Sequence, residues 1–415
     1  MKQRLKGFWT SFVIFLTVMG PGIITANVDN DAGGITTYSV AGAHFGYSML
    51  WAFIPVIIAL IVVQEMSCRM AVVTGKGLAD LIRENFGVKV TFYAMIGLIY
   101  SNVYNTISEF AGIASSAELL GISKFILVPL SSIFVWFLIV KGTYKSIEKI
   151  FLIFCLFYVS YIIAAFYSKP DWSEVTKGII HPKITFSKEY IFLLIGLIGT
   201  TITPWMQFYQ QSTVVEKGVK IEDYKYSKID VIIGAFVVNI VAFFIVLVCA
   251  NTLFKAGIRV ETARDAAIAL RPIAGNYSYY LFAIGLFNAS LFAACILPLS
   301  TAYCVCEGMG WEVGVNRKFR EAPQFYMLYT ITIIIGAVVV LLPDIKLVPL
   351  MLSAQAKNGI LLPFVLIFMV LLINNKRLMG KYTNSRIYNV IAIATTVILI
   401  ALSGLLLFFY LTGKP

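Results

Sequence analysis

A short polar run interrupts the first apolar stretch of the chain and places two carboxylates there. Residues 25–34 read TANVDNDAGG, between apolar segments that end at Ile24 and resume at Ile35. Gly33 and Gly34 are costly in a helix, and Asp and Asn side chains bond nearby backbone instead of extending one. Broken backbone at membrane depth is tolerated where it lines a wet cavity, and ionisable groups there mark ion paths. The run therefore predicts an ion site, with a surface loop between two spans as the alternative.

The acidic side chains of this run are candidate cation ligands. A hard divalent ion takes carboxylate, carbonyl and water oxygens, and an unwound helix supplies free carbonyls beside the carboxylate. Asp31 is the first candidate, and Asp29 and Asn30 are close enough in sequence to contribute. The alternative is that Asp29 or Asp31 only caps a second half-helix that begins at Ile35, by accepting a backbone N–H.

A second interruption lies about 170 residues further along, where residues 199–207 read GTTITPWMQ. Pro204 cannot donate to the carbonyl four residues earlier and clashes with it, which frees carbonyls near Thr200 and Thr201. Thr200 and Thr203 are three residues apart, so they share a helix face. A simple proline kink, with the threonines bonded to their own backbone, is the alternative. The second break favours an ion site over a surface loop at the first.

Other polar side chains also fall within apolar segments. Asn102, Asn105 and Glu109 are spaced three and four residues apart and form a stripe. This stripe either lines a vestibule or packs against another span. Gln355 interrupts the start of a later apolar segment and is a further candidate for the metal site.

The composition excludes several classes of function. Of the 415 residues, 59% are hydrophobic and 13% are charged, which no soluble domain of this length shows. The two histidines, His44 and His181, argue against histidine-based catalysis, and the six cysteines form no CxxC pair that would suggest zinc. We find no nucleophile–base pair or metal triad for an intramembrane enzyme, and we expect no cofactor. The net charge of +12 is explained by basic cytoplasmic loops, so no nucleic-acid partner is expected.

The apolar segments predict an all-α integral membrane protein with about eleven transmembrane helices in one domain, residues 1–415. The two breaks fall in the first and sixth spans, which is the pattern of an inverted repeat with its site at the midplane. The repeats would cover about residues 8–167 and 190–373, with an extra helix at about 387–412. The expected spans are about 8–27 with 35–44, 47–72, 90–118, 124–141, 147–167, 190–215, 231–254, 277–306, 324–343, 347–373 and 387–412.

The distribution of basic residues predicts the orientation of the chain. Lys and Arg are roughly twice as frequent on the segments that are cytoplasmic if the N-terminus lies inside. An odd number of spans then places the C-terminus outside. We expect a multi-pass protein of the cell membrane that works as a monomer, with the lipid bilayer and a metal ion as its partners.

Several stretches resemble the NRAMP family of divalent metal transporters. Residues 20–22 (GPG), 31–34 (DAGG) and 45–51 (FGYSMLW) are similar to the first helix of that family. Further similar stretches are residues 73–79, 109–112, 169–172, 306–308 and 362–364. The resemblance implies a LeuT-type fold, alternating access, and transport of a divalent metal ion as substrate.

The departures from the family pattern affect which metal ion the site is expected to prefer. The family aspartate is kept as Asp31, but its asparagine position holds Gly34 and its metal-binding methionine position holds Thr203. A thioether favours soft transition metals, and Mg²⁺ keeps most of its waters. We therefore expect a wider, oxygen-only site for largely hydrated Mg²⁺, and also Mn²⁺, as in the NRAMP-related magnesium transporter branch. Asp29, Thr200 and Gln355 complete the candidate metal site.

The proton-carrying positions of the family also differ here. Family histidines fall on Trp205 and Gln210, and a family aspartate falls on Thr106, while Glu109 matches the family glutamate. Without a group that titrates near neutrality, little or no proton coupling is expected. These four residues and Asn105 remain candidates for the pathway.

The alternatives are other kinds of transporter and one enzyme class. The first is a proton-coupled Mn²⁺/Fe²⁺ transporter of the same family. A sodium-coupled amino-acid carrier is disfavoured because two acidic residues in the first break would repel an anionic substrate. An intramembrane enzyme is the alternative from another class.

Overall fold

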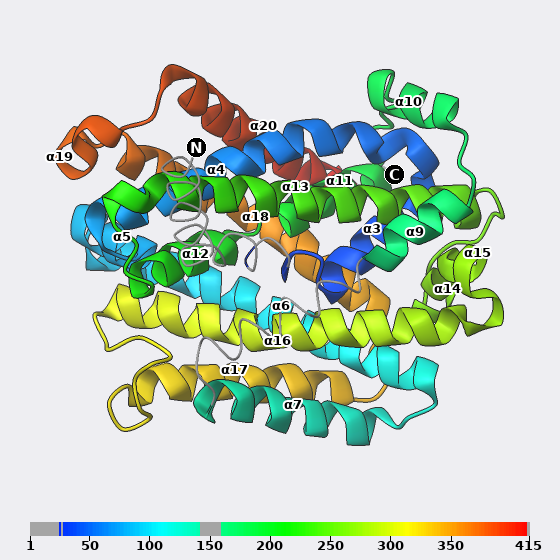
Figure 1. The fold of residues 1–415 in the computed structure, drawn as a ribbon, viewed down its shortest axis with the longest axis horizontal. Helices are drawn as coiled ribbons and strands as arrows, with labels where there is room; N and C mark the ends of the chain where they lie inside the picture. The colour runs from blue at the N-terminus through cyan, green and yellow to red at the C-terminus, as the bar shows by residue number, and fades with distance from the viewer. Residues whose placement is uncertain (1–24, 26–27, 142–158, 413–415) are drawn as a thin grey trace, which may run out of the picture.

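The computed structural model describes Thr25, residues 28–141 and residues 159–412, and the ordered elements in these ranges are all helices (Figure 1). The long helices are α3 (Ala32–Phe45), α4 (Phe53–Thr74), α6 (Val88–Leu120), α7 (Lys124–Lys141), α11 (Lys188–Thr201), α12 (Pro204–Glu216), α13 (Tyr224–Cys249), α16 (Ser278–Met309), α17 (Pro323–Leu341), α18 (Leu347–Ile373) and α20 (Arg386–Thr412). Shorter ones are α5 (Leu78–Phe86), α9 (Val159–Tyr167), α10 (Trp172–Ile180), α14 (Ala263–Ala267), α15 (Arg271–Ala274) and α19 (Lys376–Met379).

Local sequence explains where several of these helices stop. Glycines in the left-handed region follow α4, α6 and α16, at Gly75, Gly121 and Gly310, with φ of 65°, 70° and 75°. This conformation costs a glycine little and lets its N–H reach a carbonyl of the last turn. Each helix therefore ends where the chain supplies a residue that tolerates the turn.

The predicted spans correspond closely to the observed helices. The spans expected at 124–141 and 347–373 coincide with α7 and α18, and the connection expected at 169–189 contains the short helix α10. Within the described ranges, eight segments are long and apolar enough to cross a membrane, and α3 and α4 count as one of them. α6, 33 residues long, is not among the eight because polar residues lower its mean hydropathy. Parts of the first and fifth predicted spans, at 8–24 and 147–158, lie outside the described residues.

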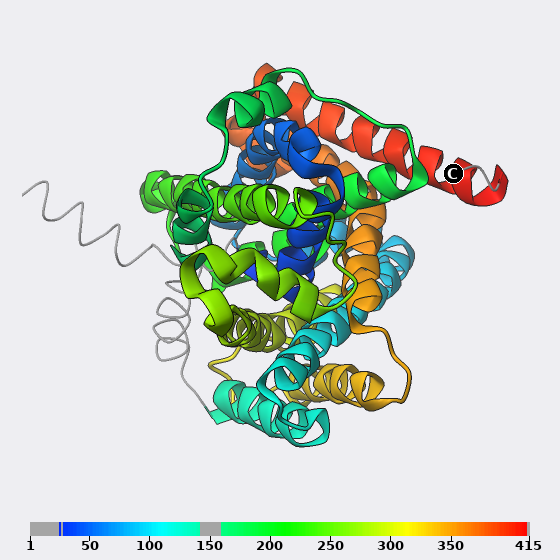
Figure 2. The same cartoon turned by 90° about the vertical axis from the view of Figure 1, so that its right-hand side faces the viewer.

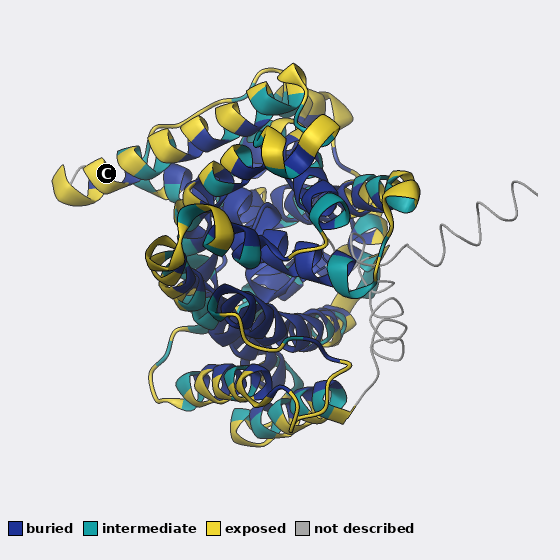
Figure 3. Cartoon of the chain, turned by 90° about the vertical axis from the view of Figure 1, so that its left-hand side faces the viewer, coloured by how far each residue is buried: buried dark blue, intermediate teal, exposed yellow. Residues whose placement is uncertain are grey.

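The helices form layers around a buried centre. α6 packs along α16, and α17 and α7 lie beyond this pair as an outer layer (Figures 1 and 2). On the other side, α3 packs against α11, α13 and α18, and α20 packs on α18 and α4. Buried residues fill the centre, while α7 and α20 present exposed surfaces (Figure 3). Large apolar side chains such as Phe125 and Ile387 are exposed there, as expected where the solvent is lipid.

The contact between α11 and α18 depends on two glycines. A Cβ atom at Gly199 would lie 2.3 Å from the Gly359 nitrogen and 2.5 Å from the Gln355 carbonyl oxygen. Backbone atoms cannot move aside like the end of a flexible side chain, so a larger residue would separate the helices. Small residues allow membrane helices to approach this closely. This approach sets the distance between the second break, at the end of α11, and the polar residues of α18.

We predict that Gly199→Ala destabilises the protein by about 1–3 kcal/mol, through strain of the tightly packed α11–α18 contact. Gly404→Ala is the matched control, because a Cβ atom at Gly404 meets no atom within 4 Å. It should leave stability unchanged or slightly higher, since alanine is the better helix former. Thermal unfolding of the detergent-solubilised variants measures both, and equal unfolding temperatures would contradict the role of this contact.

Candidate metal-ion site

The two breaks lie against each other in the centre of the molecule. α3 begins at Ala32, and the second break separates α11, which ends at Thr201, from α12, which begins at Pro204. The Thr200 hydroxyl lies 3.5 Å from the Asp29 carbonyl oxygen, across 171 positions of sequence. The second half-helix therefore begins three residues earlier than the predicted start at Ile35, because Asp31 already supplies a cap for it.

Asp31 caps α3, so the capping alternative describes a real contact. The Gly34 N–H donates to Asp31 Oδ1, with 2.5 Å between nitrogen and oxygen. The side chain is buried, with 3% of its residue surface exposed. A carboxylate has about four lone-pair sites, so one capping bond leaves the others able to hold a cation. Capping and ion binding are compatible at this residue.

The Asp29 carboxylate is buried beside the Thr203 hydroxyl, which faces it. Neither carboxylate oxygen forms a well-aligned hydrogen bond with another described residue. Both residues are 1% exposed. A buried charged carboxylate is costly unless it is paired or coordinates a cation. Asp29 and Thr203 therefore offer free oxygens beside Asp31.

Glu109 brings a third carboxyl group to the same helix end. The Ala32 N–H donates to Glu109 Oε2 over 3.2 Å, and Glu109 Oε1 has no partner in the described part of the chain. The N-terminus of a helix carries a partial positive charge that favours such anionic groups. Within the described ranges, no Lys, Arg or His side chain forms an ion pair with Asp29, Asp31 or Glu109. A cation or a proton would balance the charge of these carboxylates.

A chain of amides connects Asp31 to α18 and α6. Gln355 Nε2 lies 3.4 and 3.5 Å from the two Asp31 oxygens, and Gln355 Oε1 accepts from Asn358 Nδ2 over 2.8 Å. Asn358 in turn exchanges hydrogen bonds of 2.8 and 2.9 Å with Asn105, and Ser101 donates to it over 2.6 Å. The Asn105 side chain thus packs α6 against α18 through these bonds.

The orientation of Gln355 bears on its predicted role at the metal site. Its nitrogen faces Asp31, and an amide N–H donates hydrogen bonds but cannot ligate a cation. Its oxygen is already bonded to Asn358. In this arrangement Gln355 positions the Asp31 carboxylate, and its oxygen would face an ion only after the amide rotates.

Gly34 does not widen the site in this conformation, contrary to the expectation from sequence. A Cβ atom there would lie 2.2 Å from the Asp29 carbonyl oxygen, 3.1 Å from Thr200 Oγ1 and 3.2 Å from Asp31 Oδ1. Because Gly34 has no side chain, the two breaks can approach each other this closely. It brings a carbonyl, a hydroxyl and a carboxylate oxygen together, which are the ligand types of a hard cation.

Three of the predicted pathway residues are less directly connected to the site. The Thr106 hydroxyl donates to the Asn102 carbonyl of its own helix over 2.9 Å. The Trp205 carbonyl accepts from Ser300 over 3.3 Å, and Gln210 is buried with both amide atoms unbonded among the described residues. No hydrogen bond within residues 28–141 and 159–412 joins these three side chains to Asp29 or Asp31.

Tyr38 belongs to the site region but was not among the predicted residues. Its hydroxyl lies 2.9 Å from Thr201 Oγ1 and so ties α3 to the end of α11. It is seven residues after Asp31 and therefore on the same helix face, which is the signal that could have identified it.

The groups that face the break in the described part of the chain offer oxygen atoms. Within the described residues, no group of three acidic, histidine or cysteine side chains is arranged to hold a metal ion. Two aspartates, one backbone carbonyl and two threonine hydroxyls surround the break instead. Such oxygens bind a hard cation directly or through its waters.

Comparison with known proteins identifies the family. Residues 22–409 match the model of the family described as natural resistance-associated macrophage protein-like (Nramp). The chain belongs to this family. It is 24% identical to the divalent metal cation transporter MntH of Caldanaerobacter subterraneus, over 99% of this chain and 98% of that protein. The NRAMP resemblance seen in the sequence is therefore confirmed.

Solved structures show that this Nramp chain has the LeuT-type fold. The Eremococcus coleocola manganese transporter superposes with a TM-score of 0.78 at 19% identity, covering 97% of this chain and 87% of that chain. Mhp1, a nucleobase-cation-symport-1 family transporter, superposes with a TM-score of 0.59 at 11% identity, covering 96% and 94%. The predicted fold class is confirmed.

We predict that Gly34→Ala lowers ion uptake by this Nramp protein at least tenfold, because the new Cβ atom pushes the Asp29 carbonyl away from Asp31. Gly196→Ala, on the same side of the molecule in α11, is the control, since its Cβ atom would make only ordinary contacts, 3.5 Å or longer. Uptake into proteoliposomes measures both. Equal uptake by Gly34→Ala and wild type would show that the two breaks need not touch.

Proposed function

We propose that this chain transports Mg²⁺, and also Mn²⁺, by alternating access, with the ion largely hydrated and with little or no proton coupling. The observation that carries the proposal is the break around Asp31, where buried oxygens gather without a basic or thioether group among their described contacts. Mg²⁺ dehydrates reluctantly and is held through one or two carboxylates plus waters.

The relatives support transport of a divalent metal ion, and one of them names manganese. One is named a divalent metal cation transporter and another a manganese transporter. Hydroxyl, carbonyl and carboxylate oxygens do not favour soft metals, whereas a thioether would. Thr203 stands where the resemblance places that thioether, so the proposal assigns this chain to the NRAMP-related magnesium branch. The relatives are transporters, which agrees with our expectation that the chain is not an enzyme.

The proposed absence of proton coupling rests on the residues that stand where the family has its proton-carrying aspartate and histidines. The Thr106 hydroxyl is bonded to its own helix, and Trp205 and Gln210 have side chains that do not titrate near neutrality. Glu109 retains one oxygen without a partner among the described residues, which favours the alternative of a proton-coupled Mn²⁺/Fe²⁺ transporter. A divalent ion gains about 4.6 kcal/mol per 100 mV of membrane potential, which suffices for accumulation without protons.

The path to the site is proposed to begin in a cavity of about 670 Å³ at the outer face. Its lining includes Glu118, Glu189 and Glu261 together with His44 and Lys346. Clefts with several acidic groups raise the local concentration of cations. Because Asp29 and Asp31 are buried, an ion would reach them only after the helices move. We place the N-terminus in the cytoplasm and the C-terminus outside, in a protein of the cell membrane that acts as a monomer.

The proposal is tested by uptake into proteoliposomes with Mg²⁺, Mn²⁺ and Ca²⁺ side by side, while the internal pH is recorded. Wild type should take up Mg²⁺ and Mn²⁺ without acidifying the lumen, and Asp31→Ala should reduce uptake to the level of empty liposomes, because it removes the carboxylate that the break is built around. Mg²⁺-driven acidification that disappears in Glu109→Gln would establish the proton-coupled alternative. Mn²⁺ uptake without Mg²⁺ uptake would refute the assignment of the ion.

We predict that Thr203→Met shifts the ratio of Mn²⁺ to Mg²⁺ uptake at least tenfold toward Mn²⁺, because a thioether is a soft ligand. Thr213→Met, further along α12 and with its hydroxyl bonded to the Gln210 carbonyl, is the control and should keep the wild-type ratio. Competition of the two ions for uptake gives the ratio directly. The same ratio in Thr203→Met and wild type would mean that selectivity is set elsewhere.

A further inference from the structure

A second cavity, lined by several charged side chains, lies far from the break, at the end of the molecule where α4, α12 and α16 finish. Its volume is about 290 Å³, and its lining comes from the α4–α5 corner, α12, α16 and the loop before α17. Three carboxylates line it: Asp80, Glu216 and Glu307. By the proposed orientation this is the cytoplasmic end, on the side to which an imported ion would leave.

Glu307 is the unusual member of the three. It is 5% exposed, and its Oε2 atom has no hydrogen-bond partner among the described residues. The carboxylate lies directly over Gly77, where a Cβ atom would be 2.0 Å from Oε2. A buried carboxylate oxygen that lines a wet cavity without a partner needs a cation or a proton.

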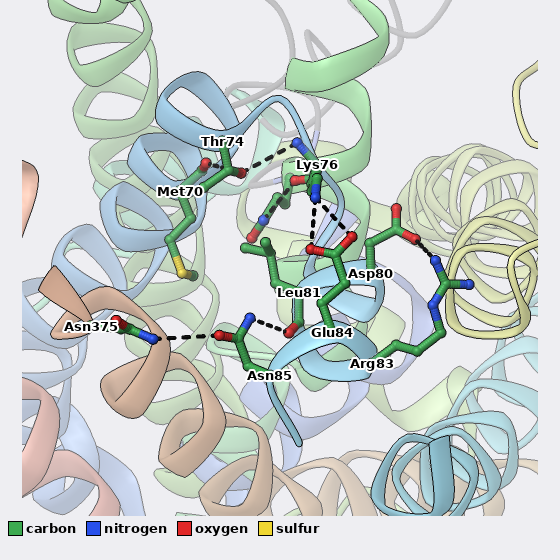
Figure 4. A network of polar contacts seen from close by, with 10 residues as sticks. Met70, Thr74, Lys76, Asp80, Leu81, Arg83, Glu84, Asn85 and Asn375 are labelled. Carbon is green, nitrogen blue, oxygen red and sulfur yellow. Dashed lines mark hydrogen bonds and ion pairs between the residues drawn. The ribbon is translucent and has the colours of Figure 1, made fainter. Parts of the chain in front are cut away.

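The neighbouring basic residues are already paired with other carboxylates. Lys76 Nζ lies 2.7 Å from both oxygens of Glu84, and Arg83 donates to Asp80 over 2.9 Å (Figure 4). Arg317, which also lines the cavity, lies 3.4 Å from Glu312. Glu307 has no ion pair of its own in the described part of the chain, so its charge is not cancelled by these side chains.

The other carboxylates have partners that hold them in place around the cavity. Glu216 accepts from the Tyr303 hydroxyl and from Asn316 Nδ2, the latter over 3.1 Å. Asp80 is held by Arg83. Each still has lone pairs for a further donor, such as a water molecule of a hydrated ion.

We propose that this cavity is a second binding site for a hydrated divalent cation, with Glu307 as its direct ligand and Asp80 and Glu216 bound through water. The three groups are not arranged to ligate one ion together, and the cavity has room for a partly hydrated one. Mg²⁺ and Mn²⁺ both accept one carboxylate with several waters. The site would hold the ion after it leaves the break and before it enters the cytoplasm.

The test measures Mn²⁺ binding to the purified full-length protein by the loss of the free-ion electron paramagnetic resonance signal. It is carried out in the Asp31→Ala variant, so that the outcome does not depend on the proposed transport site. This variant should still bind one Mn²⁺ that Mg²⁺ displaces, and adding Glu307→Gln should weaken the binding at least tenfold. Adding Glu222→Gln instead, at an exposed carboxylate outside the cavity lining, should leave binding unchanged.

A second variant, which moves the Glu307 carboxylate without changing any charge, tests the proposal if Glu307→Gln does not fold. Gly77→Ala retains every carboxylate, and its backbone, with φ of −68°, accepts alanine, but the Cβ atom would displace the Glu307 carboxylate. In the Asp31→Ala background it should also weaken Mn²⁺ binding at least tenfold. Absence of Mn²⁺ binding in Asp31→Ala alone, or equal binding with and without either added change, would overturn the proposal.

Discussion

Three buried carboxylic acids meet where the helical backbone is interrupted at two places. The surrounding helices pack so that these acids are accommodated. Asp29, Asp31 and Glu109 are each at most 3% exposed. Water cannot satisfy them, so backbone N–H groups at the start of α3, an amide of α18 and hydroxyls of the second break surround them. Glu109 and these partners come from four helices, α3, α6, α11 and α18, so the acids can be accommodated only if those helices are assembled correctly.

The breaks and spans could be predicted because they depend on local chemistry. Pro204 begins α12 directly after the second break, where its missing N–H costs nothing. At the first break α3 begins after Asp31, which caps it, whereas Gly33 and Gly34 lie inside α3 and do not interrupt it. α7 and α18 were predicted to the residue because apolar segments with charged or polar ends have the length of a membrane span. Helix starts were less accurate where a side chain changes the boundary, as Asp31 does by capping α3.

The details of the site depend on contacts between distant segments, which local chemistry does not specify. Gly34 reads as a missing ligand in the sequence, yet its lack of a side chain admits the Asp29 carbonyl. Gln355 reads as an oxygen donor, yet its bond to Asn358 turns the nitrogen toward Asp31. Thr106 and Asn105 are adjacent, but the first bonds its own helix and the second bonds α18.

The amide chain has a direction, and that direction responds to what occupies the break. Gln355 donates toward the Asp31 carboxylate and accepts from Asn358, which is bonded to α6 through Asn105. A cation at Asp31 repels that N–H group and favours rotation of the amide, which would set the Gln355 nitrogen against the Asn358 nitrogen. Two donors cannot bond each other, so the hydrogen bond between Gln355 and Asn358 within α18 is lost. Occupancy of the proposed ion site would thus remove one of the bonds that hold Asn358 in the orientation in which it bonds α6 through Asn105.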